Sequence, residues 1–266
     1  MRIVFLTNTY TQSAVSYIRK LAGVNEEVAG VFLVEQRTKY QKKVLKIFSV
    51  IKKYGLSAVL RRLRKALYLH LRYLMFGKLK RINKSKKKEY LSIEELSLDY
   101  SLPIVKVRNI NHEKIKDSIK NLKPDIIFVC TLNQIVQKEI LDIPQHGCIN
   151  IHAGLLPRYR GPASNFWVLF NGEEKTGITF HYMTEGIDDG DIILQKELRI
   201  LPDDTEDTLD MRLAKLGSES ICEVIKQIGN GTLKRRPQSE QQASYFHQPK
   251  REHRKLLNKT RKKSLR

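Results

Sequence analysis

The chain has 266 residues, 41% of them hydrophobic, which is enough for the core of one large domain and excludes a globally disordered protein. No uninterrupted apolar run of about 18 residues occurs, so the sequence predicts no ordinary membrane-spanning helix. The formal net charge of +21 is concentrated in two segments: residues 37–88 hold 19 Lys or Arg and no acidic residue, and residues 250–266 hold nine Lys or Arg and one Glu. The remaining residues are mildly acidic, so the positive charge is not expected to carry the chemistry.

The first residues and the cysteines favour a protein of the reducing cytoplasm. MRIVFLTNTY (1–10) begins a buried-strand pattern without the layout of a signal peptide. The three cysteines, Cys130, Cys148 and Cys222, have neither an even number nor the spacing of metal ligands. We therefore expect thiols that pack as small hydrophobic groups, and no metal site.

Residues 1–36 predict a strand, a helix and a second strand. MRIVFLTN (1–8) and VAGVFLVEQ (28–36) are apolar runs typical of buried strands, and SAVSYIRKLA (13–22) is typical of the helix between them. A helix that connects two such strands predicts a parallel pair with a right-handed crossover.

Residues 38–90 interrupt this pattern. Leucines recur at three- and four-residue steps from Leu56 to Leu74, opposite a face rich in Arg and Lys, which predicts a basic helical hairpin inserted after the second strand. A cationic amphipathic helix can bind an anionic membrane, and clustered basic residues can bind nucleic-acid phosphates. A solvated helical decoration or a dimer contact would show the same pattern, so the sequence leaves these interpretations open.

Helices and strands alternate again after the insertion. Apolar runs predict strands at 126–131, 148–154, 177–183 and 192–200, and amphipathic runs predict helices at 112–123 and 205–228. This order is typical of an α/β fold, with a doubly wound, mostly parallel, Rossmann-like sheet. We assign residues 1–230 to this domain and residues 231–266 to a C-terminal extension that ends in a disordered basic tail.

Asn150 and His152 are the first candidates for chemistry. They are two residues apart near the end of a predicted strand, so their side chains share one face at the edge where α/β sheets bind ligands. A carboxamide and an imidazole placed side by side there can polarise a carbonyl and handle a proton.

The acidic turn EGIDDGD (185–191) is the second candidate. A carboxylate from this turn could hold the imidazole of His152 in its cationic form. The residues alone leave the pairing open, because His152 could be a hydrogen-bonded strand-end histidine and the turn a solvated loop. The turn supplies too few oxygen ligands for calcium. Its acidic residues are Glu185, Asp188, Asp189 and Asp191.

These segments resemble the formyltransferase family, which includes glycinamide ribonucleotide, methionyl-tRNA and nucleotide-sugar N-formyltransferases. The resemblance is close over about 122–230 and absent over 38–90. His152 and Asp188 are 36 residues apart, as the family spacing requires. The chain departs from the pattern at Gly154, where many relatives carry Ser. The matching residues are Asn150 and His152; Leu155, Leu156, Pro157 and Gly161; Thr176 and Gly177; and Ile187, Asp188, Asp189 and Gly190.

The resemblance implies transfer of a formyl group from 10-formyltetrahydrofolate to an amine. The implied catalytic residues are Asn150, His152 and Asp188. The Asn150 amide and a protonated His152 would hold the carbonyl oxygen as it becomes negative, and Asp188 would keep His152 charged and help, through water, to remove the amine's proton. The implied folate contacts are Thr131, Leu132, Asn133, Gln134, Thr184, Glu185, Gly186 and Ile187.

The loop LLPRYRG (155–161) supplies the implied substrate contacts, Arg158, Tyr159 and Arg160. Arginine suits bidentate contacts to an anionic substrate, but these arginines could equally pin the loop. The sequence leaves both interpretations open.

The acceptor implied by the resemblance is the amine of a nucleotide-linked amino sugar, destined for lipopolysaccharide or another surface polysaccharide. YRGPASNFWVLFNGEEKTG (159–177) most resembles sugar N-formyltransferases, and the residues after 228 are too few for the β-barrel domain that methionyl-tRNA formyltransferases add. Methionyl-tRNA and glycinamide ribonucleotide are the alternatives, and a non-catalytic partner in membrane or polysaccharide assembly is a remote one. We expect a homodimer by analogy, and membrane contact through 38–90 would place this cytoplasmic protein at the membrane periphery.

Overall fold

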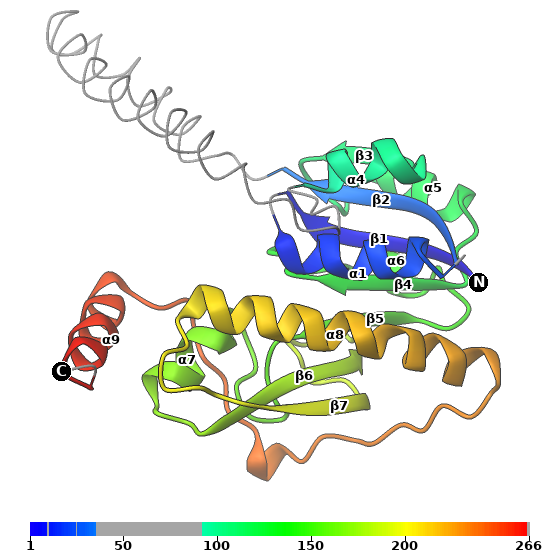
Figure 1. Ribbon diagram of the computed structural model, residues 1–266. Coiled ribbons are helices and arrows are strands. Elements are labelled where there is room, and N and C mark those ends of the chain that lie inside the picture. The colour runs from blue at the N-terminus through cyan, green and yellow to red at the C-terminus, as the bar shows by residue number, and fades with distance from the viewer. Residues whose placement is uncertain (10, 25, 36–91, 265–266) are drawn as a thin grey trace, which may run out of the picture. The chain divides into compact units, whose positions relative to one another are not determined.

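The structure of the protein is a computed structural model that describes residues 1–264 apart from residues 10, 25 and 36–91 (Figure 1). The predicted basic hairpin, with its membrane, nucleic-acid and dimer interpretations, lies outside the described residues. In the part of the chain that the structure describes, no helix is long and apolar enough to cross a lipid bilayer.

The described residues form a seven-stranded sheet in the order β3-β2-β1-β4-β5-β6-β7 (Figure 1). The first five strands in chain order pair in parallel, whereas β6 pairs antiparallel with both β5 and β7. The prediction of a doubly wound, mostly parallel α/β sheet is therefore confirmed. The strands are β1 (Arg2–Asn8), β2 (Glu27–Val34), β3 (Ile104–Val107), β4 (Ile126–Cys130), β5 (Cys148–His152), β6 (Lys175–Tyr182) and β7 (Ile192–Arg199).

Helices pack on both faces of this sheet and connect its strands. Helix α8 begins at a favourable cap: the Thr205 hydroxyl accepts the backbone N–H of Thr208 over 3.0 Å. The helices are α1 (Gln12–Ala22), α4 (Ile93–Tyr100), α5 (Glu113–Asn121), α6 (Lys138–Leu141), α7 (Ser164–Phe170), α8 (Glu206–Gly229) and α9 (Arg251–Ser264).

Three buried clusters hold these layers together. Helices α1, α4 and α8 contribute to the core on one face of the sheet, together with Phe5, Phe128 and Phe180. Helices α5 and α6 contribute to the core on the other face. The third cluster surrounds Trp167 and joins α7 and α9 to the first half of α8. Burial of these apolar side chains, rather than helix propensity, is the main source of stability.

The predicted disordered basic tail is wrong, because residues 251–264 form α9. The helix packs on α7: the His253 and Trp167 rings lie 5.1 Å apart, and Leu257 is buried. Arg254 forms an ion pair with Glu206 at the start of α8. The positive charge of the segment concealed these few apolar and aromatic anchors.

Candidate active site

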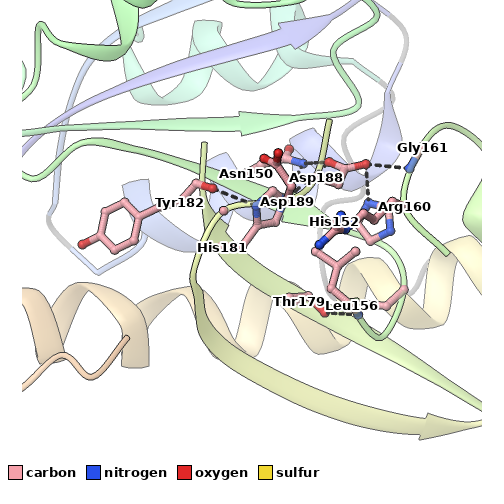
Figure 2. A network of polar contacts seen from close by, with 12 residues as sticks. Asn150, His152, Leu156, Arg160, Gly161, Thr179, His181, Tyr182, Asp188 and Asp189 are labelled. Atoms are coloured by element: carbon pink, nitrogen blue, oxygen red, sulfur yellow. Dashed lines mark hydrogen bonds and ion pairs between the residues drawn. The ribbon is translucent and has the colours of Figure 1, made fainter. Parts of the chain in front are cut away.

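Asn150, His152 and Asp188 converge near the carboxyl end of β5 (Figure 2). Asn150 and His152 share a face of the strand because side chains alternate along it. The connection between β6 and β7 brings Asp188 back over this face, with Asp188 itself in the left-handed conformation (φ 53°). Asp188 Oδ1 accepts a hydrogen bond from Asn150 Nδ2 over 3.0 Å, and Asp188 Oδ2 lies 3.5 Å from His152 Nδ1. Two segments that are distant in sequence therefore meet at one point.

His152 is enclosed, with 6% of its surface exposed. Its Nε2 lies 2.9 Å from the carbonyl oxygen of Tyr159, while Nδ1 faces Asp188. Both partners are acceptors, so only the imidazolium can donate at both ring nitrogens. Burial lowers the pKa of His152, and the Asp188 carboxylate offsets part of this effect. Asp188 therefore favours the charged imidazole, as expected, but burial opposes it and has the larger effect on the pKa of His152.

Asp188 is the fixed negative charge of the cluster. Burial raises its pKa, but the charge on His152, the contact with His181 and the backbone N–H of Gly161 together outweigh burial and hold the pKa well below the usual range of an aspartate. The Gly161 N–H donates to Oδ2 over 2.8 Å. Gly161 has a φ of 96°, and a Cβ there would lie 2.4 Å from the carbonyl oxygen of Phe246. A side chain at this position would therefore disturb the contact that orients the carboxylate.

His181 belongs to the same cluster, although the sequence did not single it out. It lies on β6 opposite Asn150 on β5, and only 2% of its surface is exposed. His181 Nε2 lies 3.1 Å from Asn150 Nδ2, and His181 Nδ1 lies 2.9 Å from the carbonyl oxygen of Tyr182. A single histidine inside an apolar strand gives no sequence signal for such a position.

The loop 153–163 after β5 is anchored to the neighbouring strands. The Thr179 hydroxyl of β6 donates to the carbonyl of Gly154 over 2.5 Å. Gln195 Nε2 of β7 donates to the carbonyl of Leu156 over 2.7 Å and to the Thr179 hydroxyl over 3.0 Å. These buried polar contacts fix the start of the loop, and with it the carbonyl that His152 meets.

Gly154, where the chain departs from the family pattern, lies against the catalytic histidine candidate. A Cβ at this position would lie 2.9 Å from His152 Nε2 and 3.4 Å from Ser164 Cβ. The glycine therefore leaves room for the imidazole to reach the Tyr159 carbonyl. A side chain at this position would have to displace the imidazole from that contact.

The C-terminal extension links this loop to the acidic turn through Gln238. Gln238 Nε2 donates to the carbonyls of Asp188 over 2.9 Å and Gly190 over 2.7 Å. Its Oε1 accepts from Nε and Nη2 of Arg160, over 3.1 and 3.0 Å. The amide nitrogen thus holds the backbone at Asp188 and Gly190, while the amide oxygen holds Arg160 of the loop.

We expect Gln238→Leu to lower the free energy of unfolding by about 1–3 kcal/mol, because two carbonyls and a guanidinium lose a partly buried partner. Gln242 is exposed on the same extension, so Gln242→Leu serves as the control and should change stability by less than about 0.5 kcal/mol. Urea unfolding of both variants measures the difference. Equal stability of the two variants would show that the Gln238 bridge contributes nothing.

Aromatic side chains fasten the extension to α7. The ring of Phe246 stacks on Tyr159, with centroids 5.0 Å apart and an interplanar angle of 12°. Phe246 also lies 5.0 Å from the Trp167 ring, and Trp167 Nε1 donates to the carbonyl of His247 over 2.9 Å. Trp167, which lies in the segment 159–177 that most resembles sugar N-formyltransferases, is therefore buried in this packing.

The three residues expected to contact substrate differ in their surroundings. Arg160 is 8% exposed, and its guanidinium pairs with Glu240 over 2.7 Å, so the geometry favours its loop-pinning interpretation. The Tyr159 ring is buried, and its hydroxyl donates to Glu173 over 2.6 Å. Arg158 pairs with Glu173 but has 57% of its side chain exposed. Arg158 is thus the member of the set that an external anion can reach.

The residues expected to contact folate lie in two loops. Thr131–Gln134 follows β4, and Thr184–Ile187 lies between β6 and β7. Leu132 and Met183, one from each loop region, pack against the core cluster on the same face of the sheet. The Gln134 side chain already accepts a backbone N–H over 2.9 Å and donates to a backbone carbonyl over 2.7 Å. It is therefore a structural group in this loop.

Cys148 shares the strand face of Asn150 but is a packing group. Its Sγ lies 3.8 Å from the carbonyl oxygen of Ile140, beneath α6. Burial raises the pKa of the thiol to about 12, so a thiolate nucleophile does not form at neutral pH.

Comparison with known sequences identifies relatives of the chain. A family model described as "Formyl transferase" matches residues 1–225. Methionyl-tRNA formyltransferase of Clostridioides difficile (strain 630) is 40% identical over 153 residues, which cover 58% of this chain and 50% of the relative. The same enzyme of Alkaliphilus metalliredigens (strain QYMF) is 40% identical over 162 residues, which cover 61% and 52%. The chain thus spans about half the length of the curated relatives it matches.

Solved structures with a similar fold include other enzymes described as formyl transferases or transformylases. The sugar 3N-formyl transferase WlaRD, in the presence of dTDP and 5-N-formyl-THF, has a TM-score of 0.60 and 22% identity, with coverage of 93% of this chain and 70% of that one. Glycinamide ribonucleotide transformylase 1 from Symbiobacterium toebii has a TM-score of 0.61 and 16% identity, with coverage of 90% and 94%. At these identities the likeness shows the fold.

Proposed function

The chain belongs to the formyl transferase family, and from this membership we propose that it transfers a formyl group from 10-formyltetrahydrofolate to a primary amine. The observation that carries the proposal is the convergence of Asn150, His152 and Asp188 on one face of β5. Structures of similar fold are described with 5-N-formyl-THF or with folinic acid, which supports a formylated folate as the donor.

The cluster can supply what acyl transfer needs, a donor for the carbonyl oxygen and an acceptor for the amine's proton. In our proposal, the Nε2–H of protonated His152 turns from the Tyr159 carbonyl to the formyl oxygen, because an oxygen with developing charge is the stronger acceptor. That charge and the Asp188 carboxylate together favour the imidazolium against the effect of burial. Asp188 receives, through water, the proton that the amine loses as the new C–N bond forms.

The two loops beside the cluster fit a flat heteroaromatic group. Ile135 and Ile187, one beside each loop, are apolar yet 65% and 45% exposed, so a ring placed against them would remove apolar surface from water. The backbone of 131–134 and 184–187 would meet the polar edge of the pterin. The Gln134 side chain is left out of this assignment because the backbone already occupies it.

We propose a nucleotide-linked amino sugar as the acceptor. The likeness to the sugar 3N-formyl transferase extends over 93% of this chain, and a similar structure from Helicobacter canadensis is described in complex with dTDP-3-aminofucose. We assign the exposed side chain of Arg158 to the nucleotide phosphates. To bind them, Arg158 would break its ion pair with Glu173.

An assay with the full chain tests this proposal. The protein is incubated with 10-formyltetrahydrofolate and a panel of dTDP- and UDP-linked amino sugars, and both tetrahydrofolate release and the mass of the formylated sugar are followed. We expect formylation of at least one amino sugar. If the protein formylates none of the amino sugars in the panel and does not formylate methionyl-tRNA, the proposed function is refuted.

Methionyl-tRNA is the second candidate acceptor, because the relatives that are 40% identical are methionyl-tRNA formyltransferases. This candidate predicts formylation of methionyl-tRNA and tRNA binding that weakens steeply with salt. It also predicts that removal of residues 37–88, which hold 19 basic residues, weakens tRNA binding. Formylation of an amino sugar but not of methionyl-tRNA would decide against it.

A further inference from the structure

The Asn150 amide nitrogen has protein acceptors for both of its hydrogens. One is Asp188 Oδ1, 3.0 Å away, and the other is His181 Nε2, 3.1 Å away (Figure 2). A primary amide has only these two hydrogens to donate. The group of Asn150 that remains for a substrate is therefore its carbonyl oxygen, Oδ1.

The tautomer of His181 follows from its other neighbour. Its Nδ1 lies 2.9 Å from the carbonyl oxygen of Tyr182, which can only accept, so Nδ1 carries a hydrogen. Its Nε2 lies 3.1 Å from Asn150 Nδ2 and 3.5 Å from Asp188 Oδ1. The shorter contact is with the amide nitrogen, which can only donate, so in the neutral ring the Nε2 lone pair accepts from Asn150. If the Asn150 amide were turned by half a rotation, its oxygen would face both the Asp188 oxygen and this lone pair. Two contacts between acceptors would replace two hydrogen bonds, which sets the direction of the amide.

We propose that His181 is a positioning residue that fixes the Asn150 amide with its nitrogen turned inward and Oδ1 turned toward the substrate. This inference rests on the proposed function. In it, Asn150 Oδ1 accepts a hydrogen bond from one N–H of the attacking amine and so aims the lone pair of the amine nitrogen at the formyl carbon. Holding the carbonyl oxygen then falls to His152. This arrangement changes the expected role of Asn150 from a donor to the carbonyl oxygen into an acceptor for the amine.

The first test needs no substrate and is therefore independent of the proposed function. Long-range ¹H–¹⁵N spectra of the uniformly labelled protein report which ring nitrogen of each histidine carries the hydrogen, and the His181→Phe variant assigns the His181 signals. We expect the Nδ1–H tautomer for His181 at neutral pH. A hydrogen on Nε2 would overturn the proposal, because the ring would then donate toward an amide nitrogen.

The second test compares two substitutions at the same position. His181→Phe removes the acceptor for Asn150, and we expect kcat to fall about tenfold with an unchanged KM for the folate. His181→Gln can accept from Asn150 through Oε1, and we expect kcat within about threefold of the unchanged protein. His146→Phe, at a histidine outside the site, is the control. If His181→Phe has the same kcat as the wild-type protein, or if the kcat of His181→Gln is no higher than that of His181→Phe, the role of His181 is overturned.

The two tests separate the proposal from the function on which it rests. A protein that shows the Nδ1–H tautomer but transfers no formyl group would refute the proposed function and support the fixed amide. If His181→Phe does not fold, the spectra of the unchanged protein, with signals assigned by His181→Gln, and the kinetics of His181→Gln still decide. A kcat of His181→Gln below one tenth of the unchanged value would count against the proposal.

Discussion

Substitution of His152 by alanine is expected to lower kcat/KM for formyl transfer by about 10³-fold. The imidazole is the proposed donor to the carbonyl oxygen, and its Nδ1 lies 3.5 Å from the Asp188 carboxylate that it pairs with when protonated. Because the ring is buried, its loss also leaves a small cavity and should cost about 1–3 kcal/mol of stability. The steady-state rate at saturating folate, with circular dichroism and thermal unfolding alongside, measures both effects.

His152→Gln separates chemistry from packing. Glutamine fills most of the space and can still donate to the Tyr159 carbonyl, but it cannot carry a positive charge. We therefore expect its rate to be nearly as low as that of His152→Ala, with a smaller loss of stability. His112→Ala, at the N-cap of α5 where the side chain forms no capping hydrogen bond, is the matched control. Near-normal rates in both His152 variants would remove this residue from the mechanism.

The longer elements of the fold could be predicted from the sequence because their apolar patterns are strong. β1, β4 and α8 coincide with the predicted segments within two residues. The missed elements are short or carry weak patterns. β3 has four residues, only one of them fully buried, because it is an edge strand, and α6 spans a single turn. Helix α7 follows a loop rich in Gly, Pro and Arg that concealed its start.

The core of the candidate site could be predicted because its residues form a motif with fixed spacing. Asn150, His152 and Asp188 were assigned together from the resemblance, and the structure brings them within hydrogen-bond or ion-pair distance. His181 and Gln238 could not be predicted in the same way. His181 contacts Asn150, 31 positions away, and Gln238 contacts Asp188 and Arg160, 50 and 78 positions away, so neither leaves a local pattern in the sequence.

The arginines of the loop show why residue type alone does not decide a role. Arg158 and Arg160 carry the same guanidinium and lie in the same loop, so sequence reasoning cannot rank one above the other as an anion ligand. Burial separates them: Arg160 is enclosed and bound to Glu240, 80 residues away, while Arg158 is largely exposed. A buried guanidinium that already has a carboxylate partner gains little from a substrate anion, because the existing pair would have to break.

Asp188→Asn is expected to lower kcat by about 10²–10³-fold with the fold retained, because the isosteric amide can neither stabilise charged His152 nor take up a proton. Without the carboxylate, the pKa of His152 should fall further below its usual value, since burial and His181 lower it and only the contact with the Tyr159 carbonyl then opposes them. The part of the pH–rate profile that depends on protonated His152 should therefore move to lower pH. Asp189→Asn, in the same turn, is the control. If the pH–rate profile does not shift, the Asp188 carboxylate does not set the pKa of His152.

The difference in stability between the protein and Asp188→Asn should depend on pH, because the pKa of Asp188 is shifted in the folded protein. The pKa of Asp188 is held well below its usual value of about 4, so ionised Asp188 stabilises the folded protein at neutral pH. This contribution is present above about pH 5 and is lost as the pH falls toward the folded pKa. The unfolding free energies of the protein and Asp188→Asn should therefore differ most at neutral pH, and the difference should shrink progressively as the pH falls below about 4. Urea unfolding at several pH values measures this, and a difference that grows on acidification would mean that Asp188 is not stabilised as a carboxylate by its neighbours.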